Sequence, residues 1–296
     1  MTSIQRRFSA LPAWIAPCAL CLLAALSPAH GFQRPVVPGE EPQVQKLESA
    51  RAQLDHASDL KRALRGLEGE TRDRARAEAV AAYRAVREFF ASDAAACSEA
   101  AFRAGELLRS ADDATGALKE FGIARDRGAG TDFKVRAMLE IGHLERRAKH
   151  AQPALAAYES VVSEETATRR QKDEALLWVG RVYEDQERFD DARRVWQKVA
   201  DDGEDPLDRV RAFDQIASLL VQKGDLEGAA GTLKRCHEAL ADVAAEETKL
   251  GERVRAALDS MRSPDQVARA VAKRRKQAEA NDAERARGQK SGAGAD

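Results

Sequence analysis

Small and apolar residues recur at fixed offsets along the chain and predict helices. In the stretch ERFDDARRVWQKVADDGEDP, residues 187–206, Ala192 precedes Trp196 by four positions and Val199 follows it by three. Spacings of three and four residues place side chains on one face of an α-helix. The stretch therefore predicts an amphipathic helix with one buried stripe.

The same stripe returns several times, each time with a small residue twelve positions before its alanine. The copies are Gly105, Ala117, Phe121 and Ala124; Gly142, Ala154, Tyr158 and Val161; Gly180, Ala192, Trp196 and Val199, with Tyr183 three after the glycine; and, more weakly, Ala217, Ala229, Leu233 and Cys236. A degenerate copy at Ala79, Tyr83 and Val86 precedes them. The small residues are 37 or 38 positions apart. A nearly constant period of this size is typical of helical solenoids.

These residues resemble the tetratricopeptide repeat (TPR) family, in which each repeat is an antiparallel pair of helices, A and B. A small residue on helix A lets helix B approach, and the alanine and aromatic residue of helix B fill the gap. The resemblance implies an all-α fold, a right-handed α-solenoid of helix pairs with a period of 37–38 residues, flanked by capping helices. The usual repeat has about 34 residues, so each unit here is longer. The family's proline near the end of helix B is also replaced, by Ala129, Thr166 and Glu204.

Local signals for helix ends agree with helix pairs. Asp205-Pro206 places a capping acid before a proline at the first helical position. Gln152-Pro153 can open a helix in the same way, and Lys223-Gly224-Asp225 combines a glycine stop with a new cap. The breaks at 110–113 and 149–152 have the length expected between antiparallel helices.

The segments outside the array are expected to differ from it. Residues 43–92 are predicted to hold N-terminal helices, including the degenerate repeat, ahead of the array at 93–241. A leucine and alanine stripe between Val44 and Leu67 indicates either a helix that caps the first repeat or a short coiled coil. We expect a capping helix at 242–262, and a charged helix with a disordered tail at 263–296.

The N-terminus has the pattern of a secretory signal in residues 1–30. Arg6 and Arg7 precede an apolar run of 14 residues, Ala13 to Leu26, which is shorter than the roughly 20 residues that span a bilayer. The sequence therefore favours an exported protein, periplasmic or secreted, cleaved near Ala29–Gly31, over one that keeps the run as an anchor. A flexible proline-rich linker is expected at 31–42.

Composition and charge reduce the range of functions that the sequence allows. Charged residues make up 33% of the 296 residues and aromatic residues 5%, while the formal net charge is −1, which gives no general bias toward nucleic acid. No phosphate-binding loop, hydrolase motif or metal-spaced cluster occurs, so no enzyme activity, cofactor or metal is expected.

Cys97 and Cys236 are too far apart in a solenoid to form a disulfide. The basic run at 273–276 lacks aromatic residues for stacking on bases, and allows at most peripheral membrane contact.

The remaining candidate is the surface of the A helices. In TPR proteins, fixed positions of helix A line a concave groove that binds peptides, and the resemblance carries that role to specific residues here. They are Phe102, Glu106, Arg109, Arg136, Leu139, His143, Arg146, Arg147, Leu177 and Arg181. Arg136, Arg146 and Arg147, flanked by Arg109 and Arg181, predict a basic groove for an extended segment that carries carboxylates.

The sequence therefore predicts a non-enzymatic, exported helical-repeat scaffold. It would mediate protein–protein or peptide binding in the bacterial cell envelope, because longer repeats of this kind look like those of exported envelope TPR proteins. The alternative is an accessory or regulatory subunit that positions an envelope enzyme.

Overall fold

The computed structural model describes residues 42–263 without 129, together with 266–267, 269–273 and 275–279. Its helices are α1 (Ala50–Ala63), α2 (Gly69–Phe89), α3 (Ala94–Arg109), α4 (Ala114–Arg127), α5 (Asp132–Arg147), α6 (Ala151–Ser163), α7 (Arg169–Asp185), α8 (Phe189–Asp202), α9 (Pro206–Gln222), α10 (Leu226–Ala245) and α11 (Lys249–Ser260). Over these ranges there is no strand, which confirms the predicted all-α class. The signal segment, the linker up to residue 41 and the tail at 280–296 lie outside the described residues.

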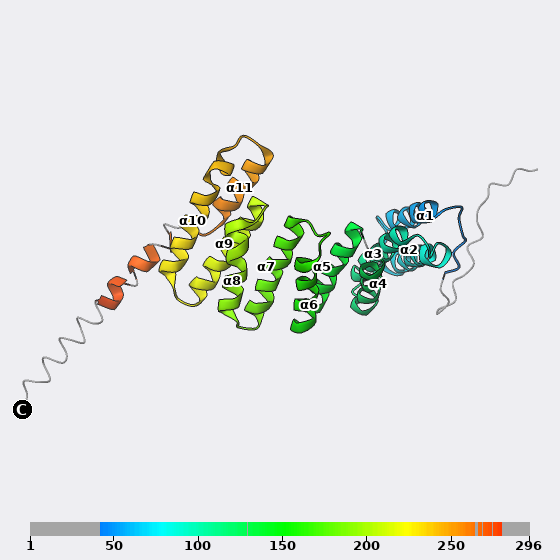
Figure 1. Ribbon diagram of the computed structural model, residues 1–296, viewed down its shortest axis with the longest axis horizontal. Helices are drawn as coiled ribbons and strands as arrows, with labels where there is room; N and C mark the ends of the chain where they lie inside the picture. Colours follow the sequence, from blue (N-terminus) through cyan, green and yellow to red (C-terminus); the bar gives the residue numbers. More distant parts are fainter. Residues whose placement is uncertain (1–41, 129, 264–265, 268, 274, 280–296) are drawn as a thin grey trace, which may run out of the picture. The chain divides into compact units, whose positions relative to one another are not determined.

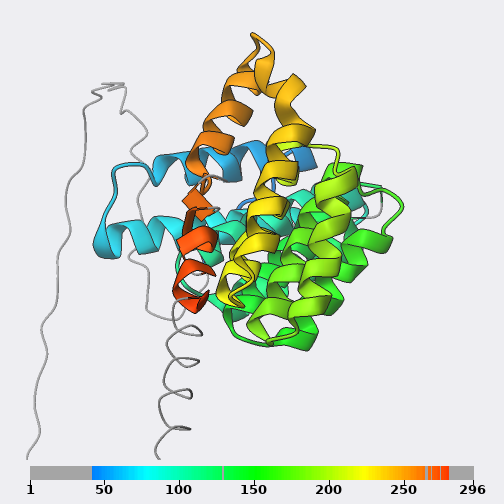
Figure 2. The ribbon, with the colours of Figure 1, turned by 90° about the vertical axis from the view of Figure 1, so that its left-hand side faces the viewer.

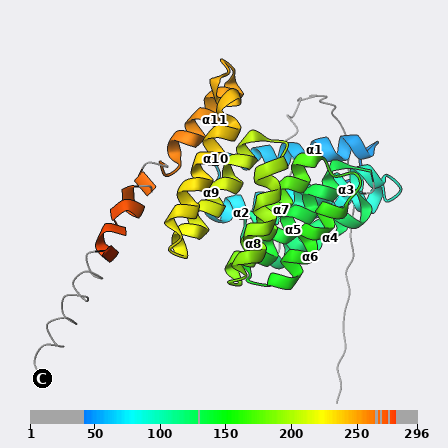
Figure 3. The ribbon, with the colours of Figure 1, turned by 60° about the vertical axis from the view of Figure 1, so that its left-hand side comes forward.

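The helices stack in chain order as antiparallel pairs, as Figures 1 and 3 show, and Figure 2 views the stack from its α10–α11 end. Each helix packs on the next one, and each odd-numbered helix also contacts the next odd-numbered helix. Within the described part of the chain, no comparable contacts join the even-numbered helices. The odd-numbered helices are the A helices. We call the surface that they form the inner face, and the surface of the even-numbered B helices the outer face.

A close contact between a glycine and an aromatic ring joins the two helices of each central pair. A Cβ atom at Gly105 would lie 2.7 Å from the Phe121 ring, and one at Gly142 would lie 2.5 Å from the Tyr158 ring. At Gly180 the distance to Trp196 would be 2.2 Å. These distances leave no room for a side chain, which explains why the pattern requires a small residue there.

The aromatic residues of this pattern are fully buried, and so are its B-helix alanines, Ala117, Ala154, Ala192 and Ala229. Phe121, Tyr158 and Trp196 have no exposed surface. The Trp196 indole also donates a hydrogen bond of 3.0 Å to the carbonyl of Leu177, which satisfies its one polar atom. In the α9–α10 pair, Leu233 replaces the aromatic residue and packs in a cluster with Ala217 and Ala229. The buried core therefore continues from pair to pair.

The turn between helices A and B has the same backbone form in four successive pairs. Asp112, Lys149, Glu187 and Gly224 all have φ between 59° and 82°. They occupy the equivalent position, seven residues after the small residue of helix A. Only Gly224 adopts this left-handed conformation without steric cost. The helix end predicted at Gly224 is therefore one example of a turn that all four pairs share. The other three pairs form it with residues that adopt a positive φ at a steric cost.

Helix starts follow the predicted signals closely. The Asp205 side chain accepts a hydrogen bond at the start of α9, where Pro206 is the first residue, and Asp225 caps α10. Helix α6 begins at Ala151, one residue before the predicted Gln152-Pro153 start. The sequence Ser263-Pro264-Asp265-Gln266 predicts a capping box at the start of the last helix, but residues 264 and 265 lie outside the described part.

The N-terminal stripe forms helix α1, which pairs with α2 and is neither a separate cap nor a coiled coil. Helix α1 begins at Ala50, later than the Val44 start of the stripe, because Ser49 caps it. It packs against α2, and the Ser58 and Tyr83 hydroxyls lie 3.2 Å apart. Ala79, Tyr83 and Val86 are buried. Helix α1 is therefore helix A of the degenerate repeat.

The C-terminal end of the stack is covered by α11. Val254 and Leu258 are buried in the same cluster as Leu233 and Leu240 of α10. Helical residues follow at 266–267, 269–273 and 275–279, and Val267 is buried in that cluster. Cys97 and Cys236 are buried and free. No described helix is long and apolar enough to cross a membrane.

Replacement of Trp196 by alanine should lower the free energy of unfolding by about 3–5 kcal/mol, because it leaves a cavity opposite Gly180. Lys119→Ala, at an exposed site on α4, should change it by less than about 0.5 kcal/mol. Urea denaturation followed by circular dichroism measures both. Equal, small losses at the two positions would contradict the packing described above.

Candidate binding surface

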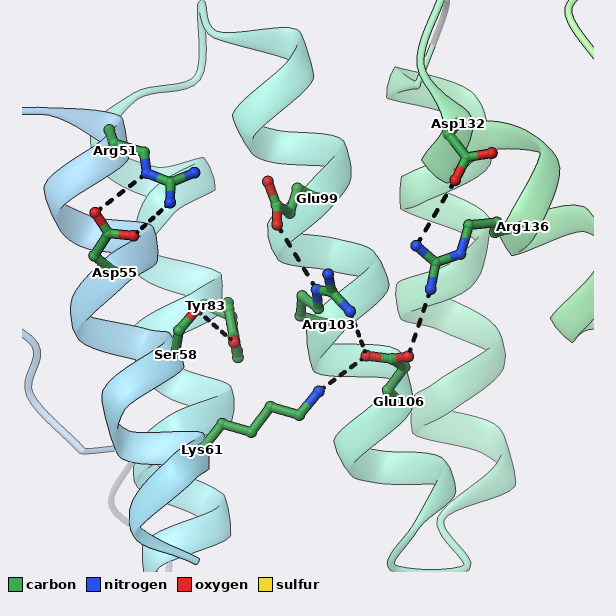
Figure 4. A network of polar contacts seen from close by, with 10 residues as sticks. All are labelled: Arg51, Asp55, Ser58, Lys61, Tyr83, Glu99, Arg103, Glu106, Asp132 and Arg136. Carbon is green, nitrogen blue, oxygen red and sulfur yellow. Dashed lines mark hydrogen bonds and ion pairs between the residues drawn. The ribbon is translucent and has the colours of Figure 1, made fainter. Parts of the chain in front are cut away.

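A polar network on the inner face is centred on Glu106 and joins three A helices. The Glu106 carboxylate accepts hydrogen bonds from Lys61 of α1 at 3.0 Å and from Arg103 of α3 at 3.2 Å. Arg136 of α5 lies 3.8 Å away and also approaches Asp132. Figure 4 shows Lys61, Arg103 and Arg136 converging on Glu106 from α1, from α3 itself and from α5. Glu106 therefore ties successive repeats together.

Most of the other predicted groove cations are also paired within the array. Arg109 lies 3.0 Å from Glu140 of the next repeat, and Arg146 lies 3.2 Å from Asp185.

Arg181 donates to Gln215 at 2.8 Å and pairs with Glu184 at 2.6 Å. Arg147 is exposed and makes no ion pair with another described residue. The expectation of a basic groove is thus corrected: acids of the same and adjacent A helices neutralise most of its cations.

Two of the three apolar groove residues lie in the core rather than on the surface. Phe102 is 1% exposed and Leu139 is 7% exposed. The Arg136 guanidinium covers the Phe102 ring at 4.3 Å, and the Phe133 ring lies 5.6 Å away. Leu177 is half-buried. The predicted apolar floor is therefore only partly available to a partner.

An aromatic cluster around Trp178 occupies the middle of the inner face. The half-buried Trp178 ring lies 4.9 Å from the His143 ring, edge to face, and the Arg146 guanidinium stacks on it at 4.9 Å. His143 Nδ1 and the Tyr158 hydroxyl are hydrogen-bonded at 2.8 Å. Trp178 was not among the predicted groove residues, because it does not occupy one of the positions carried over from the family.

Four carboxylates cross the inner face diagonally. Glu106, Glu140, Glu174 and Asp208 come from successive A helices and are each 34 residues apart. This interval is shorter than the 37–38 residue repeat, so each acid lies about one helical turn nearer the N-terminus of its helix. The regular interval is visible in the sequence and could have identified Glu140 and Glu174. Arg103 precedes Glu106 by three positions on the same helix, which the sequence also shows, whereas Lys61 has no comparable signal because its role depends on contact between repeats.

Burial and mutual repulsion alter the acidity of these carboxylates. Burial raises the pKa of Glu140, and the nearby charges of Glu106 and Glu174 raise it further against the opposing effect of Arg109. Burial, with the charge of Asp208, raises the pKa of Glu174. For Glu106, burial acts in the same direction, but hydrogen bonds from Lys61 and Arg103 outweigh it and lower the pKa.

The described residues contain no group of three or more His, Cys, Asp and Glu side chains placed to hold a metal ion. His143 and His150 lie on either side of the break between α5 and α6. His150 pairs with Glu145, whereas His143 contacts Tyr158. Burial raises the pKa of the Cys236 thiol to about 12, so this thiol is protonated at neutral pH and is a poor nucleophile.

Comparisons with known proteins give low similarity. No family model matches the chain, and no curated protein sequence matches it. Among solved structures it is similar to MamA 41-end from Desulfovibrio magneticus RS-1, with 19% identity, a TM-score of 0.47, and coverage of 64% of this chain and 93% of that one.

Another MamA structure has 16% identity and a TM-score of 0.48, with 67% and 97% covered. BtubC from P. vanneervenii has 12% identity and a TM-score of 0.44, with 68% and 94% covered. Because these identities and scores are low, the fold assignment rests on the helices and contacts of this chain.

The half-buried position of His143 predicts a pH effect on stability. Burial, together with the charges of Arg146, Arg109 and Arg147, lowers the pKa of His143 to about 4. Between the ordinary histidine pKa of about 6.5 and this value, the unfolded chain binds a proton that the folded chain does not. The free energy of unfolding should therefore fall as the pH drops through this window.

The imidazole resonances of His143, assigned with a His143→Phe variant, should titrate near pH 4 in NMR spectra. A midpoint near the ordinary value would contradict the buried cluster. The His143→Phe variant should also show a smaller loss of stability over the same window.

Proposed function

We propose that the chain is a non-enzymatic helical-repeat scaffold that binds an extended segment of a partner protein on its inner face. The observation that carries this proposal is the half-buried Trp178 cluster at the centre of a face made by stacked A helices. A partly exposed aromatic residue between polar side chains is a typical anchor for a protein partner. The polar lining supplies donors and acceptors for a peptide backbone.

The resemblance to the tetratricopeptide repeat family supports this use of the inner face. The glycine and aromatic contacts occur where the family's pattern places them. In that family, the surface of the A helices holds peptides. We therefore assign the chain to TPR-like scaffolds as part of the proposal.

The preferred partner segment carries carboxylates near the end of α5. Arg109, Arg146 and Arg147 surround His143 and contribute to the lowering of its pKa, which reflects a positive local potential. Arg109 and Arg146 are already paired with acids, so Arg147 is the cation most available to a partner. An exposed cation of this kind affects mainly the association rate and its salt dependence.

The proposed location is the bacterial cell envelope. The segment at residues 1–30, with Arg6 and Arg7 ahead of an apolar run, supports export followed by cleavage near Ala29–Gly31. The charged C-terminal segment permits peripheral contact with an anionic membrane. Mass spectrometry of the N-terminal peptide from the producing cells would test cleavage.

The inner-face proposal predicts a charge-specific loss of binding. Arg147→Glu should reduce capture of the partner from an envelope extract by about threefold or more, and the loss should shrink at high salt. The matched control is Lys119→Glu, which makes the same charge change on an exposed residue of α4.

Quantitative mass spectrometry of the captured proteins measures the effect. Equal losses in the two variants would mean that only net charge matters, and would contradict a binding site on the inner face. Recovery of a single enzyme in equal amount would favour an accessory subunit that positions that enzyme.

A further inference from the structure

A separate cleft opens on the outer face between α8 and α10. Its volume is about 610 Å³. Its base is formed by Ile216 and Leu220 of α9, and its walls include Arg193, Gln197 and Lys198 of α8 with Gly228, Thr232 and Arg235 of α10. This volume is in the range of sites that hold several side chains or a small ligand.

The equivalent groove between α2 and α4 is filled by the chain itself. Glu120 of α4 is 1% exposed and inserts between two arginines of α2. Arg84 Nε lies 2.8 Å from its carboxylate, and Arg87 donates to the same group. A carboxylate therefore closes the gap between these two B helices.

The repeat register identifies what the α8–α10 cleft lacks. Glu120 immediately precedes Phe121, and Thr232 immediately precedes the equivalent Leu233. By the same register, Arg84 corresponds to Gln197, and Arg87 corresponds to Ala200. The cleft between α8 and α10 therefore lies at the position where ion pairs fill the α2–α4 groove. In the cleft, the equivalent side chains of Thr232, Gln197 and Ala200 are short or neutral.

The groove between α6 and α8 is filled in another way. Val195 of α8 occupies the position of Glu120 and Thr232, and Val162 of α6 occupies that of Arg87. Both valines pack against the core cluster of α5, α6 and α7. One groove is therefore filled by ions and one by apolar side chains, whereas the α8–α10 groove stays open.

The cations of the open cleft are available to an external group. Arg193, Lys198 and Arg235 are exposed and make no ion pair with any residue that the structure describes. Four acids also line the cleft: Asp190 lies 3.9 Å from Lys223, Asp201 accepts from Gln197, Asp225 caps α10, and Asp202 makes no ion pair with a described residue. The three unpaired cations outnumber Asp202, so the walls favour a negatively charged occupant.

We propose that a partner protein inserts a glutamate or aspartate side chain of an acidic segment between α8 and α10. The carboxylate takes the place that Glu120 occupies between α2 and α4, and it pairs with Arg193 and Arg235. Apolar side chains of the same segment lie toward Ile216 and Leu220. This site is distinct from the inner face.

The proposal is tested with a fluorescein-labelled peptide of alternating glutamate and leucine, and with a lysine–leucine peptide for comparison. All proteins carry Arg147→Glu, which weakens binding at the inner face equally in every variant. The parent should bind the acidic peptide in fluorescence anisotropy. Thr232→Glu/Gln197→Arg supplies the missing ion pair without changing net charge, and should weaken binding by about tenfold or more.

The matched control is Ala156→Arg/Ser160→Glu, which adds the same residues at exposed positions of α6 and should leave binding unchanged. Circular dichroism checks that each variant folds. If Thr232→Glu/Gln197→Arg does not fold, Arg193→Glu/Arg235→Glu tests the same contact and should also abolish binding. Equal affinity for the two peptides, or unchanged binding in the cleft variants, would overturn the proposal.

Discussion

The structure depends on the close contact between a small residue of each A helix and the large residue of its B helix. In the α5–α6 pair this contact joins Gly142 to Tyr158, and in the α7–α8 pair it joins Gly180 to Trp196. Each contact fixes the distance within a pair while burying a large apolar ring. Because a repeat touches only its neighbours, the same contact must be formed again in every pair.

Once the pairs are fixed, the odd-numbered helices contact one another and their polar side chains interlock. Glu106 receives cations from α1, α3 and α5, and Arg146 reaches Asp185 of the next repeat. The inner face is therefore cross-linked by charge rather than being a free basic surface. On the outer face, the groove between α2 and α4 is filled by ions and the groove between α6 and α8 by valines, whereas the α8–α10 groove is left open. Binding capacity thus depends on which charges remain unpaired.

The sequence predicted the helix pairs well, because the positions that set them are local. Spacings of three, four and twelve residues place Gly180, Ala192 and Trp196 together without knowledge of other repeats. The binding surface was harder to predict. Whether Arg109 is free or paired with Glu140 depends on a contact across 31 positions. The burial of Phe102 depends on Phe133 and Arg136 of α5, the next A helix. Charge patterns within one helix do not contain that information.

A double-mutant cycle at Gly142 and Tyr158 tests the central contact most directly. Gly142→Ala should lower the free energy of unfolding strongly in the native background, because the new Cβ would lie 2.5 Å from the ring. In a Tyr158→Ala background the ring is absent, and the same change should cost little or even stabilise the helix. We therefore expect a coupling free energy of about 1–3 kcal/mol from urea denaturation. An equal cost of Gly142→Ala in both backgrounds would contradict the account.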